Sequence, residues 1–413
     1  MVDQRLRART RWTRLPGVMS VSRPTAWLRS QFPTRPHTAP DFLLSRPHGS
    51  VRTQGVRDVP QSIAAAATAL RTGDAEMVVG ALPFDPEQPA ALTIPERIVR
   101  EPGILHPHPY YLSGPGAGLS ARVAATDPDA DEHRERVARA VAAIRAGQAK
   151  KIVLARAVDI EFAAPVDPLL VAARLIATSA NHEGFIADLS PAGESFAGRM
   201  LVGASPEVLV HKAGTTVTAY PLAGSAPRKA DASADAAAAR ALAYSGKDRA
   251  EHAFVVDHLR QALAPLCCRL AIPSEPELTQ TNEVWHLATP ITGELDHKHA
   301  GLTALELAQL VHPTPAICGT PTARARDYIL GTESPRGFYA GAVGWADSSG
   351  DGEFMVAIRC ADVAADGLSA RTWAGGGIVA DSDPAVELAE TTAKLGTMMR
   401  ALGIENSAAA GLA

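Results

Sequence analysis

Two residues far apart in the sequence have the character of a general base and a general acid. Lys151 begins the apolar stretch KIVLAR, where period-two alternation puts it on one face with Val153 and Ala155. A lysine amine that loses its hydration gives up its proton more readily and acts as a base. Glu207, in GASPEVL, precedes an apolar strand, where a desolvated carboxylic acid stays protonated. The alternatives are a strand-end lysine that reaches water and an ordinary turn glutamate.

Two expected helices each carry acidic side chains on a single face. Asp248 and Glu251 lie three residues apart in KDRAEH, and Glu387, Glu390 and Lys394 share one face of the last helix. Carboxylates from two helices suit Mg²⁺, which binds a few of them and completes its shell with water and an anionic substrate. The alternative is a solvated face with a Glu390–Lys394 ion pair.

Several motifs of other enzyme classes are absent from the sequence. The glycines of AGGGIV lack the spacing of a dinucleotide fingerprint and the lysine of a P-loop, so they predict either a backbone that approaches an anion or a simple turn. The thirteen His show no HExxH spacing, and no GxSxG occurs. His286 and His312 are each more typical of structural roles. The four Cys form no CxxC pair, which favours free thiols in a reducing compartment.

The composition is that of a folded protein. Of the 413 residues, 46% are hydrophobic and 20% charged, which excludes wholesale disorder. The net charge of −4 gives no overall signature of nucleic-acid binding, and no apolar run approaches the roughly 20 residues that cross a bilayer. We therefore expect a cytoplasmic protein that binds neither nucleic acid nor membrane.

Residues 1–37 differ in character from the remaining chain, 38–413. They contain eight Arg and a single acidic residue, Asp3. A disordered extension, or a start codon placed upstream of a true start at Met19, is the preferred interpretation. A transit peptide or a patch for phosphate-rich partners remains an alternative.

The expected elements are mixed along residues 38–413, which read as one domain. Helices are predicted at 60–73, 131–147 and 232–266, with the last from about 384 to 402. Strands are predicted at 150–162, as a hairpin within 198–214, and as an antiparallel pair at 338–347 and 353–363. Neither a strict βαβ alternation nor an all-β meander results. An α+β fold with a large, mainly antiparallel sheet is therefore expected.

Together these segments resemble the chorismate-utilising enzymes, most closely the isochorismate synthases. The matching segments follow the order of that family between Lys150 and Lys394, and weaker similarity reaches back to about Phe42. They are KKIVLAR, GASPEVL, PLAGSAPR, SGKDRAEH, VWHLATPI, HPTPAICG, GFYAGAVGW, VAIRCA, AGGGIV and ELAETTAK. Each is a weak signal alone, whereas the ordered set is specific.

The resemblance implies one large α+β domain with a two-layered, mainly antiparallel sheet and outer helices. It implies binding of chorismate with Mg²⁺ as cofactor, and Mg²⁺-dependent isomerisation to isochorismate: water adds at ring carbon 2 and the hydroxyl at carbon 4 leaves. It also implies a protein that is often monomeric and has no glutaminase subunit. The pathway stays open among menaquinone, catechol siderophore and salicylate synthesis.

The family's functional positions transfer to this chain residue by residue. Lys151 matches the base that activates water, and Glu207 the acid that protonates the departing hydroxyl. The resemblance implies Glu251 and Glu390 as Mg²⁺ ligands, with Asp248 and Glu387 holding metal-bound water. The implied substrate-binding residues are Gly224, Ser225, His286, Ala316, Tyr339, Arg359, Gly375 and Lys394.

Three positions discriminate activities within the family. Ala223 replaces the nucleophilic lysine of aminodeoxychorismate synthases, and Lys151 stands where anthranilate synthases typically carry Gln. Ser225, where salicylate synthases usually have Thr, favours stopping at isochorismate. A salicylate synthase, which also releases pyruvate, is the enzymatic alternative. A catalytically inactive chorismate-binding relative, or a protein that works through its Arg-rich segment, is the non-enzyme alternative, which the joint presence of the matched residues disfavours.

Overall fold

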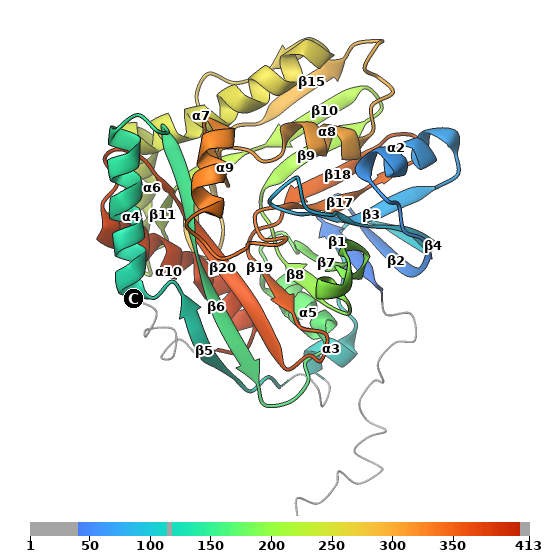
Figure 1. The fold of residues 1–413 in the computed structure, drawn as a ribbon, viewed down its shortest axis with the longest axis horizontal. Helices are drawn as coiled ribbons and strands as arrows, with labels where there is room; N and C mark the ends of the chain where they lie inside the picture. Colours follow the sequence, from blue (N-terminus) through green and yellow to red (C-terminus); the bar gives the residue numbers. More distant parts are fainter. Residues whose placement is uncertain (1–39, 114–117, 405–413) are drawn as a thin grey trace, which may run out of the picture.

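Most of the strands join edge to edge into one long antiparallel sheet (Figure 1). The computed structural model describes residues 40–113 and 118–404, so the predicted extension at 1–37 lies outside the described residues. Within them, seventeen strands pair in this sheet. Its first half runs β5 (Ala121–Asp127), β6 (Lys151–Phe162), β20 (Ser369–Ile378), β19 (Cys360–Val363), β8 (Met200–Gly203), β7 (Gly184–Asp188), β1 (Phe42–Arg46), β2 (Gly49–Asp58) and β4 (Ala91–Pro102).

The long strand β4 connects this half to a second one. Its first residues pair with β3 and its remainder with β2, so both halves share it. The second half continues through β3 (Met77–Leu82), β17 (Ala342–Asp347), β18 (Gly352–Val356), β9 (Val208–Ala213), β10 (Thr216–Tyr220), β15 (Ile291–Leu295) and β12 (Cys267–Ala271). The short β16 (Gly319–Thr320) pairs with the start of β6. A separate small sheet contains β11 (Leu222–Pro227), β14 (Val284–Ala288) and β13 (Glu277–Gln280).

Two buried apolar clusters hold the layers together. One contains residues of both halves of the sheet, such as Leu154 of β6 and Val343 of β17, so the two halves face each other. The other packs the outside of the first half against helices, with Val202 and Met399 among its members. The helices are α2 (Ile63–Thr72), α3 (Pro109–Ser113), α4 (Ala130–Arg145), α5 (Pro168–Thr178), α6 (Ala232–Tyr244), α7 (Gly246–Leu263), α8 (Ala304–Val311), α9 (Thr322–Leu330) and α10 (Pro384–Ala401). Three short 3-10 turns lie at Ser190–Ala192, Glu194–Phe196 and Ala264–Leu266.

Several local predictions are confirmed because their signals are local. Helix α2 ends at Gly73, whose positive φ of 79° closes the helix. Helix α4 buries the apolar stripe that its periodicity predicts, including Val137 and Val141. The helical stretch predicted at 232–266 is two helices, since Ser245 interrupts it and caps α7 by accepting a hydrogen bond from the Asp248 amide at 3.2 Å.

Two strand predictions are wrong in their pairing. The stretch 198–214 is no hairpin, because β8 pairs with β7 and β19 whereas β9 pairs with β10 and β18. The chain between them crosses from one half of the sheet to the other. Likewise 353–363 is not one strand: β18 pairs with β17 as predicted, but Arg359, at φ +50°, turns the chain into β19 in the other half. Alternating hydrophobicity predicts a strand but not its partner.

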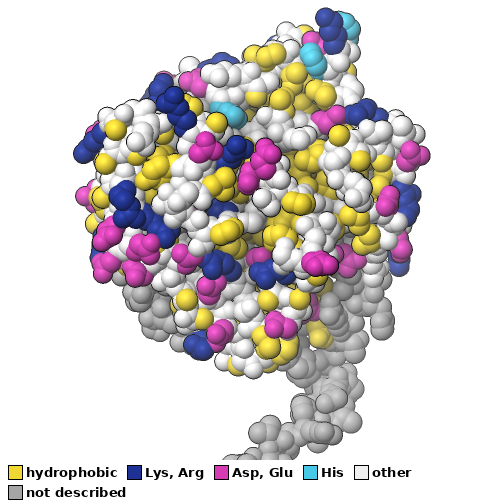
Figure 2. Space-filling view, viewed as in Figure 1, with side chains coloured by type: hydrophobic (Ala, Val, Ile, Leu, Met, Phe, Trp, Pro, Cys, Tyr) yellow, Lys and Arg dark blue, Asp and Glu magenta, His cyan; other side chains and the backbone are white. Residues whose placement is uncertain are grey.

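One of the two interpretations of the glycines of AGGGIV, a simple turn, does not hold. They lie inside strand β20, paired along β6 from Gly375↔Ala155 to Gly377↔Val153, so the turn interpretation is wrong. Over the part of the chain that the structure describes, no helix is both long and apolar enough to span a membrane. On the face drawn in Figure 2, acidic and basic side chains are interspersed among apolar ones.

Candidate active site

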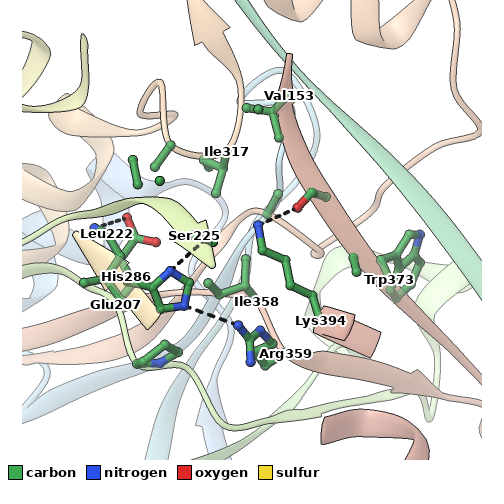
Figure 3. Close-up of a pocket in the computed structure, with 18 of the residues that line it drawn as sticks. Val153, Glu207, Leu222, Ser225, His286, Ile317, Ile358, Arg359, Trp373 and Lys394 are labelled. Atoms are coloured by element: carbon green, nitrogen blue, oxygen red, sulfur yellow. Dashed lines mark hydrogen bonds between the residues drawn. The ribbon is translucent and has the colours of Figure 1, made fainter. Parts of the chain in front are cut away.

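One pocket gathers most of the residues singled out in the sequence (Figure 3). It has a volume of about 680 Å³, mouth included, and is lined by β6 and β20 of the first half of the sheet, the small sheet, α7, α10 and segments that connect strands. Its walls contain Glu207, Gly224, Ser225, Glu251, His286, Ala316, Tyr339, Arg359, Gly375 and Lys394. The other four predicted site residues, Lys151, Asp248, Glu387 and Glu390, are not in the wall. Lys151 contacts the wall residue Glu251, and Glu390 contacts the wall residue Lys394.

Lys151 is completely buried at the start of β6. Its Nζ lies 3.0 Å from Oε1 of Glu251, the carboxylate that projects from α7. A Cβ at Gly377 would lie only 2.3 Å from that carboxylate oxygen and 2.8 Å from Cε of Lys151, so any larger residue there would displace this pair. The strand-end lysine that reaches water is therefore the wrong interpretation.

Glu207 lies where the chain crosses between the two halves of the sheet, and it is buried. Oε1 accepts a hydrogen bond from the Leu222 amide at 3.4 Å (Figure 3). Burial raises the pKa of Glu207 to about 8, against the opposing effects of that hydrogen bond and of Lys151 and Lys394. A protonated acid at neutral pH follows from this burial. Glu207 and Lys394 line the same pocket.

The acidic faces of α7 and α10 meet lysines rather than solvent. Glu390 accepts from Lys394 Nζ at 2.6 Å, which confirms the ion pair, but both side chains are mostly buried, so the solvated face is wrong. Oε1 of Glu387 accepts from Lys247 Nζ at 2.8 Å and from Ser382 Oγ at 2.7 Å. Together with Lys151–Glu251, three carboxylates each lie next to the side-chain nitrogen of one lysine.

The carboxylates also act on one another. Burial raises the pKa of Asp248, and the charges of Glu251 and Glu390 raise it further. Burial raises the pKa of Glu387, and Glu390 adds to this. For Glu251 burial acts in the same direction, but Lys151 and two further lysines outweigh it and leave its pKa lowered. The four acidic residues therefore belong to one electrostatic cluster.

This cluster fits a hydrated divalent cation better than a fully protein-ligated one. Among the described residues, no three His, Cys, Asp or Glu side chains form a set able to hold a metal ion by themselves. Oε2 of Glu387 is nevertheless buried without a hydrogen-bond donor, an orphan acceptor that a cation or its water shell would satisfy. Mg²⁺ needs only one or two carboxylates when water and an anionic substrate supply the rest.

In the pocket wall, a buried arginine faces a histidine. Arg359 donates from Nη2 to Nε2 of His286 at 3.4 Å, while Nδ1 of that ring lies 3.0 Å from Oγ of Ser225 (Figure 3). Ser225 and His286 are cross-strand partners in the small sheet. Burial, then Arg359, then Lys394 lower the pKa of His286 well below its usual value. The ring is therefore neutral, with its proton on Nδ1 and its Nε2 occupied as an acceptor.

The floor of the pocket is formed by β20 and an aromatic pair. Lys394 donates from Nζ to the Gly375 carbonyl at 3.0 Å (Figure 3). Tyr339 stacks on Trp373 with ring centroids 5.4 Å apart and an interplanar angle of 9°. A Cβ at Gly375 would come within 3.0 Å of the Tyr339 hydroxyl oxygen, so the glycine makes room for that ring.

Some residues of the site were not predicted from the sequence. Trp373 and Ile358 line the pocket, and Lys247 faces Glu387. Lys247 lies four residues before Glu251 in KDRAEH, so helical spacing alone offered a signal for it. Trp373 offered none beyond its position before the glycines, because its stacking partner is in a different segment.

Comparison with known proteins identifies the family of this chain. Residues 115–403 match the family model described as chorismate binding enzyme. "Putative isochorismate synthase MenF" of Mycobacterium tuberculosis is 47% identical over 371 residues, covering 89% of this chain and 98% of the relative. The chain belongs to the chorismate-binding enzymes.

Two further members of this family extend the comparison. Isochorismate synthase DhbC of Bacillus subtilis is 39% identical over 381 residues, covering 88% of this chain and 94% of that protein. The crystal structure of a "putative 2,3-dihydroxybenzoate-specific isochorismate synthase, DhbC from Bacillus anthracis" superposes with a TM-score of 0.80 at 34% identity, over 92% of this chain and 99% of that one. The predicted α+β fold of the chorismate-binding enzymes is confirmed.

Proposed function

We propose that this protein is an isochorismate synthase that isomerises chorismate with Mg²⁺ bound. The observation that carries the proposal is the pocket itself: its wall contains the buried acid Glu207 and also Glu251, whose carboxylate lies 3.0 Å from Nζ of the buried Lys151. Adding water to one ring carbon while a hydroxyl leaves another requires a base for the water and an acid for the leaving group. The similarity to proteins named isochorismate synthase supports the same reaction.

In the proposed reaction Lys151, as the neutral amine, accepts a proton from the attacking water, whose oxygen bonds to ring carbon 2. The ring double bond shifts, the carbon–oxygen bond at carbon 4 breaks, and Glu207 gives its proton to the departing hydroxyl, which leaves as water. Hydroxide is a poor leaving group, and a glutamate with a pKa of about 8 holds that proton at neutral pH. A proton then returns from Lys151 to Glu207 through solvent.

The substrate is a dianion, and the cationic groups of the pocket suit its carboxylates. Arg359 and Lys394 line the cavity, and both are largely buried, so their attraction for an anion is only weakly screened by water. His286 is neutral with Nε2 occupied by Arg359. Its role is therefore to hold Arg359 in position and not to transfer protons.

Glu251 and Glu390 would hold Mg²⁺, with Asp248 and Glu387 directed at its water ligands. When bound, the ion supplies positive charge for the ring carboxylate and fixes the ring's orientation. The residues of this chain supply the remaining interactions: Lys247 and Lys394 balance Glu387 and Glu390 on the protein side.

The walls of the pocket favour isochorismate as the final product. Loss of pyruvate from isochorismate is a pericyclic elimination that needs the enolpyruvyl side chain folded over the ring. The small side chains of Ala223 and Ala316 leave that group less confined. A difference of a kcal/mol or two in barrier height separates one dominant product from the other.

Incubation with chorismate, with and without Mg²⁺, tests the proposal. We expect the reaction to reach the same ratio of chorismate to isochorismate whichever of the two compounds is supplied, as measured by chromatography. At most a trace of salicylate and pyruvate should form. Near-stoichiometric pyruvate would instead assign the protein to the salicylate synthases. No conversion in either direction would refute the proposed activity and favour an inactive chorismate-binding relative.

A further inference from the structure

Strand β6, which carries Lys151, is incomplete along one edge. On that side β16 pairs with Lys151 and Ile152, and β5 pairs only from Ala157 onward. The residues between them have no strand partner on this edge. The Val153 amide donates to the Cys318 carbonyl at 2.8 Å. With backbone partners alone, the Val153 carbonyl and the Ala155 amide would be left unpaired on this edge. Buried backbone groups of this kind destabilise a strand unless other groups bind them.

A buried ion pair fills this gap. Arg336 donates from Nη2 to the Val153 carbonyl at 2.7 Å, and Oε1 of Glu333 accepts from the Ala155 amide at 2.7 Å. The two side chains are 2% and 5% exposed, and they bind each other at 2.8 Å and 2.9 Å. Side chains thus take the place of the missing strand for two consecutive ladder positions.

The same arginine reaches two more parts of the pocket wall. Nη1 donates to the Ile317 carbonyl at 2.9 Å, which fixes the segment that contains Ala316. The Arg336 carbonyl accepts from the Tyr339 amide at 3.0 Å, and the guanidinium lies 5.9 Å from the centre of the Tyr339 ring. Val153, Ile317 and Tyr339 all line the catalytic pocket, on three separate segments.

We propose that Arg336 and Glu333 are a positioning pair that fixes Lys151 and the Val153, Ile317 and Tyr339 wall relative to one another, and that this pair thereby sets rate and product specificity. The inference rests on the proposed function. Neither residue lines the pocket, so neither is a substrate contact. A planar guanidinium binds two carbonyls and two carboxylate oxygens at fixed angles, whereas a lysine ammonium is a single point of donation.

The test compares Arg336→Lys with a matched control. Nε of Arg199 donates to both carboxylate oxygens of Asp362, at 3.0 Å and 3.1 Å, in a more exposed pair that does not line the pocket, so Arg199→Lys makes the same chemical change elsewhere in the first half of the sheet. We expect Arg336→Lys to lower kcat at least about tenfold with KM changed less than about threefold, since misplaced catalytic groups slow the chemical step without removing a substrate contact. Pyruvate released per turnover should rise several-fold. Arg199→Lys should match wild type in all three.

Amide hydrogen exchange in the substrate-free protein gives a readout that does not depend on the reaction. The Ala155 amide should exchange faster in Arg336→Lys than in wild type, and faster than in Arg199→Lys. Glu333→Gln keeps an acceptor for this amide but removes the charge, so it should lower kcat while exchange at Ala155 changes less. This second variant serves if Arg336→Lys does not fold.

The outcomes separate the two proposals. Suppose that wild type converts chorismate, and that Glu333→Gln and Arg336→Lys lower only the melting temperature. If kcat, the product ratio and amide exchange at Ala155 are then unchanged, the pair is merely structural and the inference is wrong. If wild type does not convert chorismate, the proposed function fails, and exchange at Ala155 alone decides whether the pair positions the strand.

Discussion

The raised pKa of Glu207 gives a prediction for both stability and rate. The pKa of this carboxyl is about 8 in the folded protein, against an ordinary value of 4.5. Between these values the folded state binds a proton that the unfolded chain has lost. The stabilisation is therefore fully present below about pH 4.5 and is lost as the pH rises through about 8. The full difference corresponds to roughly 5 kcal/mol, and the side chain is buried, so solvent screening reduces it little.

Glu207→Gln removes this titration while keeping the size of the side chain. Urea unfolding measured between about pH 5 and pH 9 should show wild type losing more stability than Glu207→Gln as the pH rises. Glu135→Gln, at an exposed glutamate of α4 whose side chain is 72% accessible, should follow wild type. A parallel loss of stability in Glu207→Gln and wild type would refute the burial argument.

The catalytic consequence is measured on the same variants. Because the proposed acid must be protonated, turnover of chorismate by wild type should fall above about pH 8. Glu207→Gln should lose at least about 100-fold in turnover, the usual scale for a general acid, and Glu135→Gln should retain wild-type turnover. A Glu207→Gln variant with near wild-type turnover would mean that another group protonates the leaving hydroxyl.

Three further predictions concern the proposed base, the metal and residues 1–37. Lys151→Ala should lose at least about 100-fold in turnover and keep its fold, whereas Lys150→Ala, at the exposed neighbour, should keep wild-type turnover; equal rates would exclude Lys151 as the base. Protein treated with EDTA should be inactive and regain activity with Mg²⁺, and Glu390→Gln should need more Mg²⁺ for half-maximal rate; full activity after EDTA treatment would contradict the metal assignment. Deleting residues 1–37, which carry none of the matched motifs, should leave turnover and melting temperature nearly unchanged, and a large loss of either would show that these residues contribute to the folded domain.

The sequence by itself determined the local elements and the chemical identities. Helix α4 and the strand that begins at Lys151 were predictable because the repeat of apolar side chains is a property of a few consecutive residues. The ordered motifs from KKIVLAR to ELAETTAK indicated the family, which the comparisons confirm. The sequence alone therefore indicated which residues could serve as acid, base and metal ligands.

The tertiary structure alone decided which of these residues meet. Strands β8 and β9 follow each other closely in the chain but lie in different halves of the sheet, and it is this crossing that buries Glu207 and raises its pKa. The Lys151–Glu251 pair, and the support of β6 by Arg336 and Glu333, join segments far apart in the sequence. Strand partners and buried ion pairs depend on which distant surfaces exclude water together, and no pattern within a short stretch of sequence contains that information.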